Sequence, residues 1–87
     1  MSFKNKVAIV TGAGQGIGFE ICLNLVKEGA HVILNDLDPE LANKAVESIK
    51  QSTGGSCTAM AGDSGDVTFI YQMVDSTVAQ FEKIDIV

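Results

Sequence analysis

A short segment near the N-terminus concentrates glycine, with four glycines in seven residues, at Gly12, Gly14, Gly16 and Gly18. It directly follows a continuous apolar run at residues 7–10 and opens an amphipathic pattern. Glycine adopts backbone angles that a tight turn requires, and it lets the main chain approach a ligand closely. A helix that starts at such a turn offers free N–H groups and a positive dipole end to phosphate. The pattern therefore predicts a pyrophosphate-binding loop to which Ile17 contributes backbone.

A carboxylate stands at the matching place after the next apolar run. Residues 31–34 are apolar after the initial histidine, and Asp36 follows them, 18 residues beyond Gly18. An acid at the end of the second strand can accept hydrogen bonds from the ribose hydroxyls of a dinucleotide. A glycine-rich turn that binds nothing is the alternative. The position of the glycines between an apolar run and an amphipathic run, with Asp36 after the next run, favours dinucleotide binding.

The glycine spacing excludes two related loops and disfavours a third. A P-loop has a glycine, four further residues and then Gly-Lys, but Gly12 leads at that spacing to Ile17 and Gly14 leads to Phe19, with no lysine following. The GxGxxG fingerprint does not fit either. Its last glycine would fall on Ile17 if the pattern started at Gly12, and on Phe19 if it started at Gly14. A methyltransferase also has a glycine-rich loop after its first strand and an acid after its second, but its usual loop differs. The pattern that fits is Thr-Gly-x-x-x-Gly-x-Gly, formed by Thr11, Gly12, Gly16 and Gly18.

The elements that must position this loop alternate between two hydrophobic periods. Short apolar runs predict strands, and apolar residues at helical spacing predict helices between them. We expect strands at 7–10, 31–34, 57–61 and from 84 onward, and helices at 16–28, 39–53 and 67–81. Such β-α-β-α-β-α-β alternation indicates an α/β fold of the Rossmann type, a doubly wound parallel sheet in a three-layer α/β/α arrangement. In the strand order 3-2-1-4, the fourth strand would pair beside the first.

The apolar positions of the helices also predict which faces are buried. For the first helix we expect an inward stripe of Ile17, Ile21, Cys22, Leu25 and Val26. For the third helix, which Asp66 can cap, the expected inward stripe is Val67, Ile70, Val74, Val78 and Phe81.

Composition limits the classes of partner. The 87 residues contain six Lys or Arg and eleven Asp or Glu, for a net charge of −5. That balance argues against nucleic acid or a membrane as the main partner, since both require a basic surface. Cys22 and Cys57 lack metal-binding spacing and are expected to be buried and unpaired, and His31 has no companion ligands, so we predict no metal site. We expect a soluble, cytoplasmic protein.

At the glycine loop the sequence resembles the short-chain dehydrogenase/reductase family. The segment from Val7 to Gly18 is close to the most diagnostic segment of that family, and the resemblance covers the whole chain. The resemblance implies that Asp36 binds the ribose and selects NAD over NADP, and Gln15 agrees because NADP-dependent members often have a basic residue there. It also implies adenine contacts after the third strand. The cofactor-binding residues expected on this basis are Gly12, Gly14, Gln15, Gly16, Ile17, Gly18, Asp36, Leu37, Asp63 and Ser64.

The resemblance also shows which catalytic residues are missing. Catalysis in the family uses a Tyr-x-x-x-Lys pair with a serine, and on a helix that spacing puts both side chains on one face. The single tyrosine, Tyr71, is followed four residues later by Asp75, so we interpret Tyr71 as structural. Catalytic residues are therefore expected outside this chain.

We interpret residues 1–87 as the N-terminal dinucleotide-binding part of a longer oxidoreductase. By the resemblance, that enzyme transfers hydride between an alcohol or ketone and NAD(H) and forms a homo-oligomer, whereas the 87 residues alone are inactive. The alternative is a non-catalytic dinucleotide-binding module that is complete at 87 residues.

Overall fold

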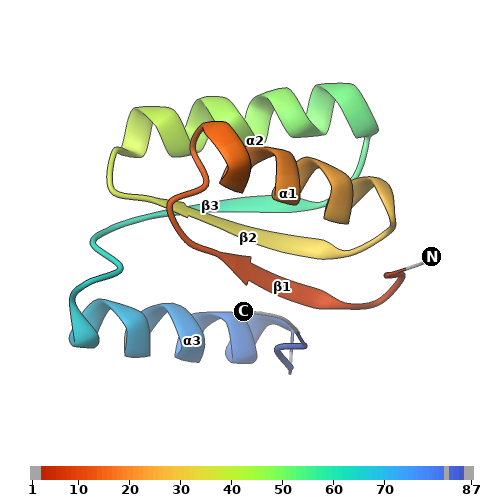
Figure 1. Cartoon of the computed structure of the whole chain (residues 1–87). Coiled ribbons are helices and arrows are strands. Elements are labelled where there is room, and N and C mark those ends of the chain that lie inside the picture. Colours follow the sequence, from red (N-terminus) through yellow and green to blue (C-terminus); the bar gives the residue numbers. More distant parts are fainter. Residues whose placement is uncertain (1–2, 82, 86–87) are drawn as a thin grey trace.

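The computed structural model describes residues 3–81 and 83–85, which form a three-layer α/β arrangement (Figure 1). In chain order, the elements are β1 (Val7–Val10), α1 (Gly16–Lys27), β2 (His31–Asp36), α2 (Pro39–Thr53), β3 (Cys57–Ala61) and α3 (Val67–Phe81). The predicted strands and helices up to residue 81 are confirmed to within two residues at each end.

The three strands form one parallel sheet in the order β1-β2-β3. Val7 pairs with His31 across β1 and β2, and Val32 pairs with Cys57 across β2 and β3. The helices α1 and α2 cover one face of this sheet, and α3 lies on the opposite face (Figure 1). Because β2 is central and covered on both faces, its apolar side chains are fully buried, as expected for a parallel strand.

Two hydrophobic clusters hold the layers together. The larger cluster lies under α1 and α2 and includes Cys22, Val26 and Ile49. The smaller cluster lies under α3 and consists of Ile9, Ile33 and Met73, with half-buried side chains packed around them. Adjacent residues of a strand point to opposite faces, so β1 and β2 contribute to both clusters.

Local sequence signals fix the ends of the helices. At the start of α2, the side chain of Asp38 accepts a hydrogen bond of 2.9 Å from the Glu40 N–H, and proline occupies the first helical position. At its end, Gly54 adopts a left-handed conformation with φ of 68°. The predicted cap of α3 is also present, since Asp66 Oδ1 accepts a hydrogen bond of 2.9 Å from the Thr68 N–H.

The predicted inward stripes of α1 and α3 are partly wrong. Ile17 is 81% exposed, and Ile21, Val67 and Val78 are also exposed. In α3, Ile70, Val74 and Phe81 pack against the core as predicted. Met73 and Thr77 are nevertheless the most deeply buried residues of this helix, because it docks with its inward stripe rotated away from Val67 and Val78. The Thr77 hydroxyl donates a hydrogen bond of 2.8 Å to the Met73 carbonyl, which satisfies the polar group inside the core.

The predicted fourth strand is not observed in the described residues. Ile84 and Asp85 belong to no strand, and residues 86–87 lie outside the described part. The Asp85 N–H nevertheless donates a hydrogen bond of 2.8 Å to the Val7 carbonyl. The neighbouring carbonyl, that of Lys6, accepts from His31 on the β2 side. Because successive carbonyls of a strand point to opposite edges, Asp85 lies at the edge of β1 away from β2, the place expected for the next strand.

Candidate functional site

The glycine loop connects β1 to α1 and lies beside the end of β2. The main-chain N–H of Ala13 donates a hydrogen bond of 2.7 Å to the carbonyl oxygen of Asn35. Ala13 is fully buried, so the middle of the loop is part of the core. The loops that follow parallel strands meet at the carboxyl edge of the sheet, where α/β proteins bind their ligands.

Three glycines of the loop are required for two different reasons. Gly12 and Gly16 adopt positive φ angles of 62° and 68°, which side chains other than glycine rarely tolerate. Gly18 is required by close approach: a Cβ atom there would lie 2.9 Å from both the Ala13 Cα and the Gly12 carbonyl oxygen. The start of α1 is thereby held against the loop.

The N-terminus of α1 suits an anion. Gln15 is the N-cap residue, and its side chain makes no capping hydrogen bond. The first turn of α1 contains no acidic residue that could compete for its N–H groups. Unpaired N–H groups and the positive end of the helix dipole favour a phosphate group at this place. Ile17 belongs to this turn, which agrees with a backbone role for it.

The carboxylate of Asp36 is held by the main chain at both oxygens. Its Oδ2 accepts a hydrogen bond of 2.9 Å from the Gly14 N–H, and its Oδ1 accepts one of 3.1 Å from the Asp38 N–H. A carboxylate offers about four acceptor positions, so about two remain for a ligand. Two adjacent hydroxyl groups, such as those of a ribose, match that remaining capacity.

Asn35 belongs to the same site, although sequence reasoning missed it. Its side chain is 1% exposed, and its amide nitrogen donates hydrogen bonds to the carbonyls of Met60 at 2.9 Å and Gly62 at 3.2 Å. The Gly62 N–H in turn donates a hydrogen bond of 3.0 Å to the carbonyl of Asp36. Asn35 therefore ties the end of β2 to the loop after β3. The sequence did contain one sign of this role, because Asn35 is an amide residue near the end of an otherwise apolar strand.

The remaining predicted contact residues lie on the exposed rim of this region. Leu37 follows Asp36 and is largely exposed. Asp63 and Ser64 are exposed in the turn after β3, where Asp63 Oδ1 accepts a hydrogen bond of 2.8 Å from the Gly65 N–H. The hydrogen bonds of Asn35 and Asp36 bring this turn to the same edge of the sheet as the glycine loop. The structure thus joins Gly14 and Asp36 directly and connects the turn of Asp63 through Gly62.

Comparison with known proteins identifies the family. The family model for the short chain dehydrogenase matches residues 6–87, which is nearly the whole chain. The chain belongs to the short-chain dehydrogenase family.

Curated members of this family share substantial identity with the chain. A probable tetrahydroxynaphthalene reductase from Zymoseptoria tritici is 43% identical over 83 residues, covering 94% of this chain and 31% of that protein. An uncharacterized oxidoreductase from Thermotoga maritima is 38% identical over 86 residues, covering 99% of this chain and 33% of that protein. The chain therefore spans about a third of the length of these short-chain dehydrogenase relatives.

Solved structures of the family share the fold and differ in cofactor. NAD+-bound xylitol dehydrogenase aligns with a TM-score of 0.90 and 35% identity, over 98% of this chain and 32% of that one. A metagenomic short-chain oxidoreductase in complex with NADP aligns with a TM-score of 0.91 and 30% identity, over 99% of this chain and 38% of that one. This part of the short-chain dehydrogenase fold thus accompanies either nicotinamide dinucleotide.

Tyr71 belongs to α3, on the face of the sheet opposite α1 and α2 (Figure 1). It is 66% exposed on α3, and the residue one helical turn later, Asp75, is exposed too. The Tyr-x-x-x-Lys pair of the family would need a lysine at that position, and the sequence has an aspartate there.

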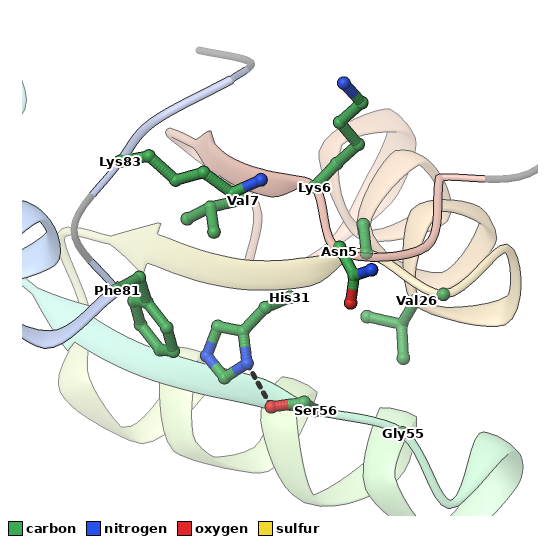
Figure 2. Close-up of a pocket in the computed structure, with 11 residues that line it drawn as sticks. Asn5, Lys6, Val7, Val26, His31, Gly55, Ser56, Phe81 and Lys83 are labelled. Carbon is green, nitrogen blue, oxygen red and sulfur yellow. Dashed lines mark hydrogen bonds between the residues drawn. The ribbon is translucent and has the colours of Figure 1, made fainter.

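A pocket of 420 Å³ lies at the opposite end of the sheet, away from the glycine loop (Figure 2). Figure 2 shows His31 beside Phe81, and their ring centroids are 3.9 Å apart. The Nδ1 atom of His31 contacts the Ser56 hydroxyl, and Nε2 lies 3.3 Å from the Thr58 hydroxyl. Burial, and then the charge of Lys50, lower the pKa of His31.

His31 and the two cysteines are held in the fold by hydrogen bonds and by burial. Both ring nitrogens of His31 have hydroxyl partners, and residues 3–81 and 83–85 contain no group of three or more side chains that could hold a metal ion. Cys22 and Cys57 are buried and free, as expected. Burial raises the pKa of Cys22 to about 12 and that of Cys57 to about 11, which disfavours the nucleophilic thiolate form of both side chains. No described helix is both long and apolar enough to cross a bilayer.

Proposed function

We propose that this chain is the NAD-binding part of an oxidoreductase that transfers hydride between an alcohol or ketone and NAD(H). The observation that carries the proposal is the carboxylate of Asp36, held at the end of β2 by the N–H of Gly14 in the glycine loop. One hydrogen bond thus joins the expected pyrophosphate loop to the expected ribose acceptor.

The roles of the individual residues follow from their positions. The glycine loop and the first turn of α1 would bind the pyrophosphate through main-chain N–H groups. Asp36 would accept hydrogen bonds from the adenosine ribose, and Leu37, Asp63 and Ser64 would line the adenine side. When bound, the nicotinamide of the cofactor supplies the site that accepts or releases hydride. The residues described above orient the adenosine half of that cofactor.

The charge of Asp36 favours NAD over NADP. A carboxylate that accepts hydrogen bonds from ribose hydroxyls faces a like charge when a 2′-phosphate replaces one of them. No Lys or Arg lies between His31 and Ala42 that could neutralise this phosphate. Since solved relatives include complexes with NAD+ and with NADP, the choice rests on these residues of the chain itself.

Two further properties belong to the full-length protein. We propose a homo-oligomer in the cytoplasm. The large apolar side chains that this part leaves exposed, such as Val67 and Val78, support association with further protein surface. The two free cysteines agree with a reducing compartment.

The test uses the full-length protein with NAD, NADP and their reduced forms, and a panel of secondary alcohols and ketones. Consumption or production of the reduced nicotinamide is followed by its absorbance. We expect NAD-linked turnover with at least one substrate, and none from residues 1–87 alone. Tight NAD binding without turnover across the panel would favour the non-catalytic dinucleotide-binding module. Binding of neither dinucleotide would contradict the proposal.

A further inference from the structure

Gly14 is a glycine that neither the loop pattern nor the backbone explains. It is not one of the glycines of Thr-Gly-x-x-x-Gly-x-Gly, and its φ is not positive, unlike that of Gly12 and Gly16. A different constraint must therefore account for the absence of a side chain at this position.

The constraint is the space that Asp36 occupies. A Cβ atom on Gly14 would lie 2.7 Å from Oδ2 and 2.9 Å from Cγ of Asp36. It would also lie 2.9 Å from the Cβ of Leu41, in the first turn of α2. Non-bonded carbon and oxygen atoms do not approach this closely, so a methyl group would displace the carboxylate, the loop or α2.

Moving the carboxylate or the loop breaks the same hydrogen bond, whereas moving α2 relieves only the contact with Leu41. The Gly14 N–H reaches Oδ2 of Asp36 at 2.9 Å only because no side chain stands between them. The Asp38 N–H would still hold Oδ1, but one donor leaves the carboxylate free to rotate about it. When both oxygens of Asp36 are held by main-chain N–H groups, the lone pairs that remain for a ligand point in one fixed direction.

We infer that Gly14 is a positioning residue that sets cofactor choice through Asp36. It holds the carboxylate where it accepts hydrogen bonds from both ribose hydroxyls and confronts a 2′-phosphate with a like charge. A carboxylate released from Gly14 can turn away, which weakens NAD binding and reduces the repulsion of NADP. This inference rests on the proposed NAD-binding function. It adds Gly14 to Asp36 as a residue that determines the preference for NAD over NADP.

The experiment is a double-mutant cycle in the full-length protein. The dissociation constants of NAD and NADP are titrated for wild type, Gly14→Ala, Asp36→Ala and the double variant. We expect Gly14→Ala to reduce the preference for NAD by about 5- to 30-fold, the consequence of losing part of one charge-assisted hydrogen bond. In the Asp36→Ala background the same change should alter the preference by less than about twofold, since the carboxylate is already absent.

The cycle separates three outcomes. An unchanged preference in Gly14→Ala overturns the inference, and so does an equal change in both backgrounds, because Gly14 would then act without Asp36. A wild-type protein that binds neither dinucleotide overturns the proposed function instead. If Gly14→Ala is too unstable for titration, the cycle is repeated with Leu41→Gly in all four proteins, which removes the contact that does not involve Asp36. The same two results then decide the inference.

Discussion

The main-chain N–H of Ala13 lies 2.7 Å from the carbonyl oxygen of Asn35 and donates a hydrogen bond to it. This bond attaches the glycine loop to β2 one residue before the acidic side chain. Ala13 is fully buried beneath the loop, so the loop cannot move without disturbing the core. The glycine loop and the carboxylate of Asp36 therefore form one rigid unit, and a preorganised unit of this kind loses little conformational entropy when a ligand binds.

Gly18→Ala should destabilise the full-length protein, although alanine is the better helix former. Gly18 lies in α1, where intrinsic propensity alone would favour alanine by about 1 kcal/mol. The new methyl group would instead meet main-chain atoms of Gly12 and Ala13 at 2.9 Å, which cannot move cheaply. We expect a net loss of about 1–3 kcal/mol in the free energy of unfolding, measured by chemical denaturation.

The matched control for this variant is Asn24→Ala, an exposed site in the same helix. It should leave the free energy of unfolding nearly unchanged. A Gly18→Ala protein that is more stable than wild type would contradict the close packing of the loop.

Asn35→Leu should destabilise the loop after β3. The substitution leaves the carbonyls of Met60 and Gly62 without the amide donor that they share. An unsatisfied buried polar group costs about 1–3 kcal/mol, so we expect a loss of about 2–4 kcal/mol in the free energy of unfolding. Chemical denaturation of the full-length protein measures it, with the exposed Asn43→Leu as the control for the new side chain.

The isosteric Asn35→Asp distinguishes hydrogen bonding from packing. It keeps the shape of the side chain but presents carboxylate oxygens to two carbonyls, so it should also be destabilising. Wild-type stability in this variant would show that the amide donor is unimportant.

Tyr71→Phe should leave catalysis by the full-length enzyme intact. The side chain is exposed on α3 and lies beside Asp75 rather than a lysine. We expect kcat/KM to stay within about twofold of wild type, a change of less than about 0.5 kcal/mol in the activation free energy. A tenfold or greater fall in kcat with unchanged stability would place Tyr71 in the catalytic machinery.

The local part of this structure could be predicted from the sequence, and the long-range part could not. The apolar runs, the cap at Asp38 and the glycine turn act over a few residues, and each was found at its place. The exposure of Ile17 and Val67 depends on how a helix rotates when it docks on the sheet. Periodicity alone does not fix that rotation, because an apolar stripe is wider than the contact it makes.

The candidate site also has a local part that could be predicted from the sequence and a long-range part that could not. The position of Asp36 at the end of β2 follows from strand length and was predicted. The bond from Gly14 to Asp36 and the buried amide of Asn35 depend on the register of three strands, which brings distant residues together only in the folded protein.

A polypeptide of residues 1–87 alone should self-associate. Ile17, Val67 and Tyr71 expose large apolar surface. Within residues 3–81 and 83–85, no strand pairs with the outer edge of β1, where Asp85 bonds the N–H and the carbonyl of Val7. Unpaired parallel edges and exposed apolar patches promote association. We expect sedimentation velocity to show species that grow with concentration. A monomer with a cooperative thermal transition would contradict this expectation.

The most direct test of the central claim is cofactor titration of the full-length protein and its Asp36→Ala variant. The account predicts that wild type binds NAD more tightly than NADP. Loss of the carboxylate should weaken NAD binding by about 10- to 100-fold, since charge-assisted hydrogen bonds are worth about 1.5–3 kcal/mol each. NADP binding should weaken less or improve, because the like charge is removed. A wild-type protein that binds NADP as tightly as NAD, or a variant with an unchanged preference, would contradict the role assigned to Asp36.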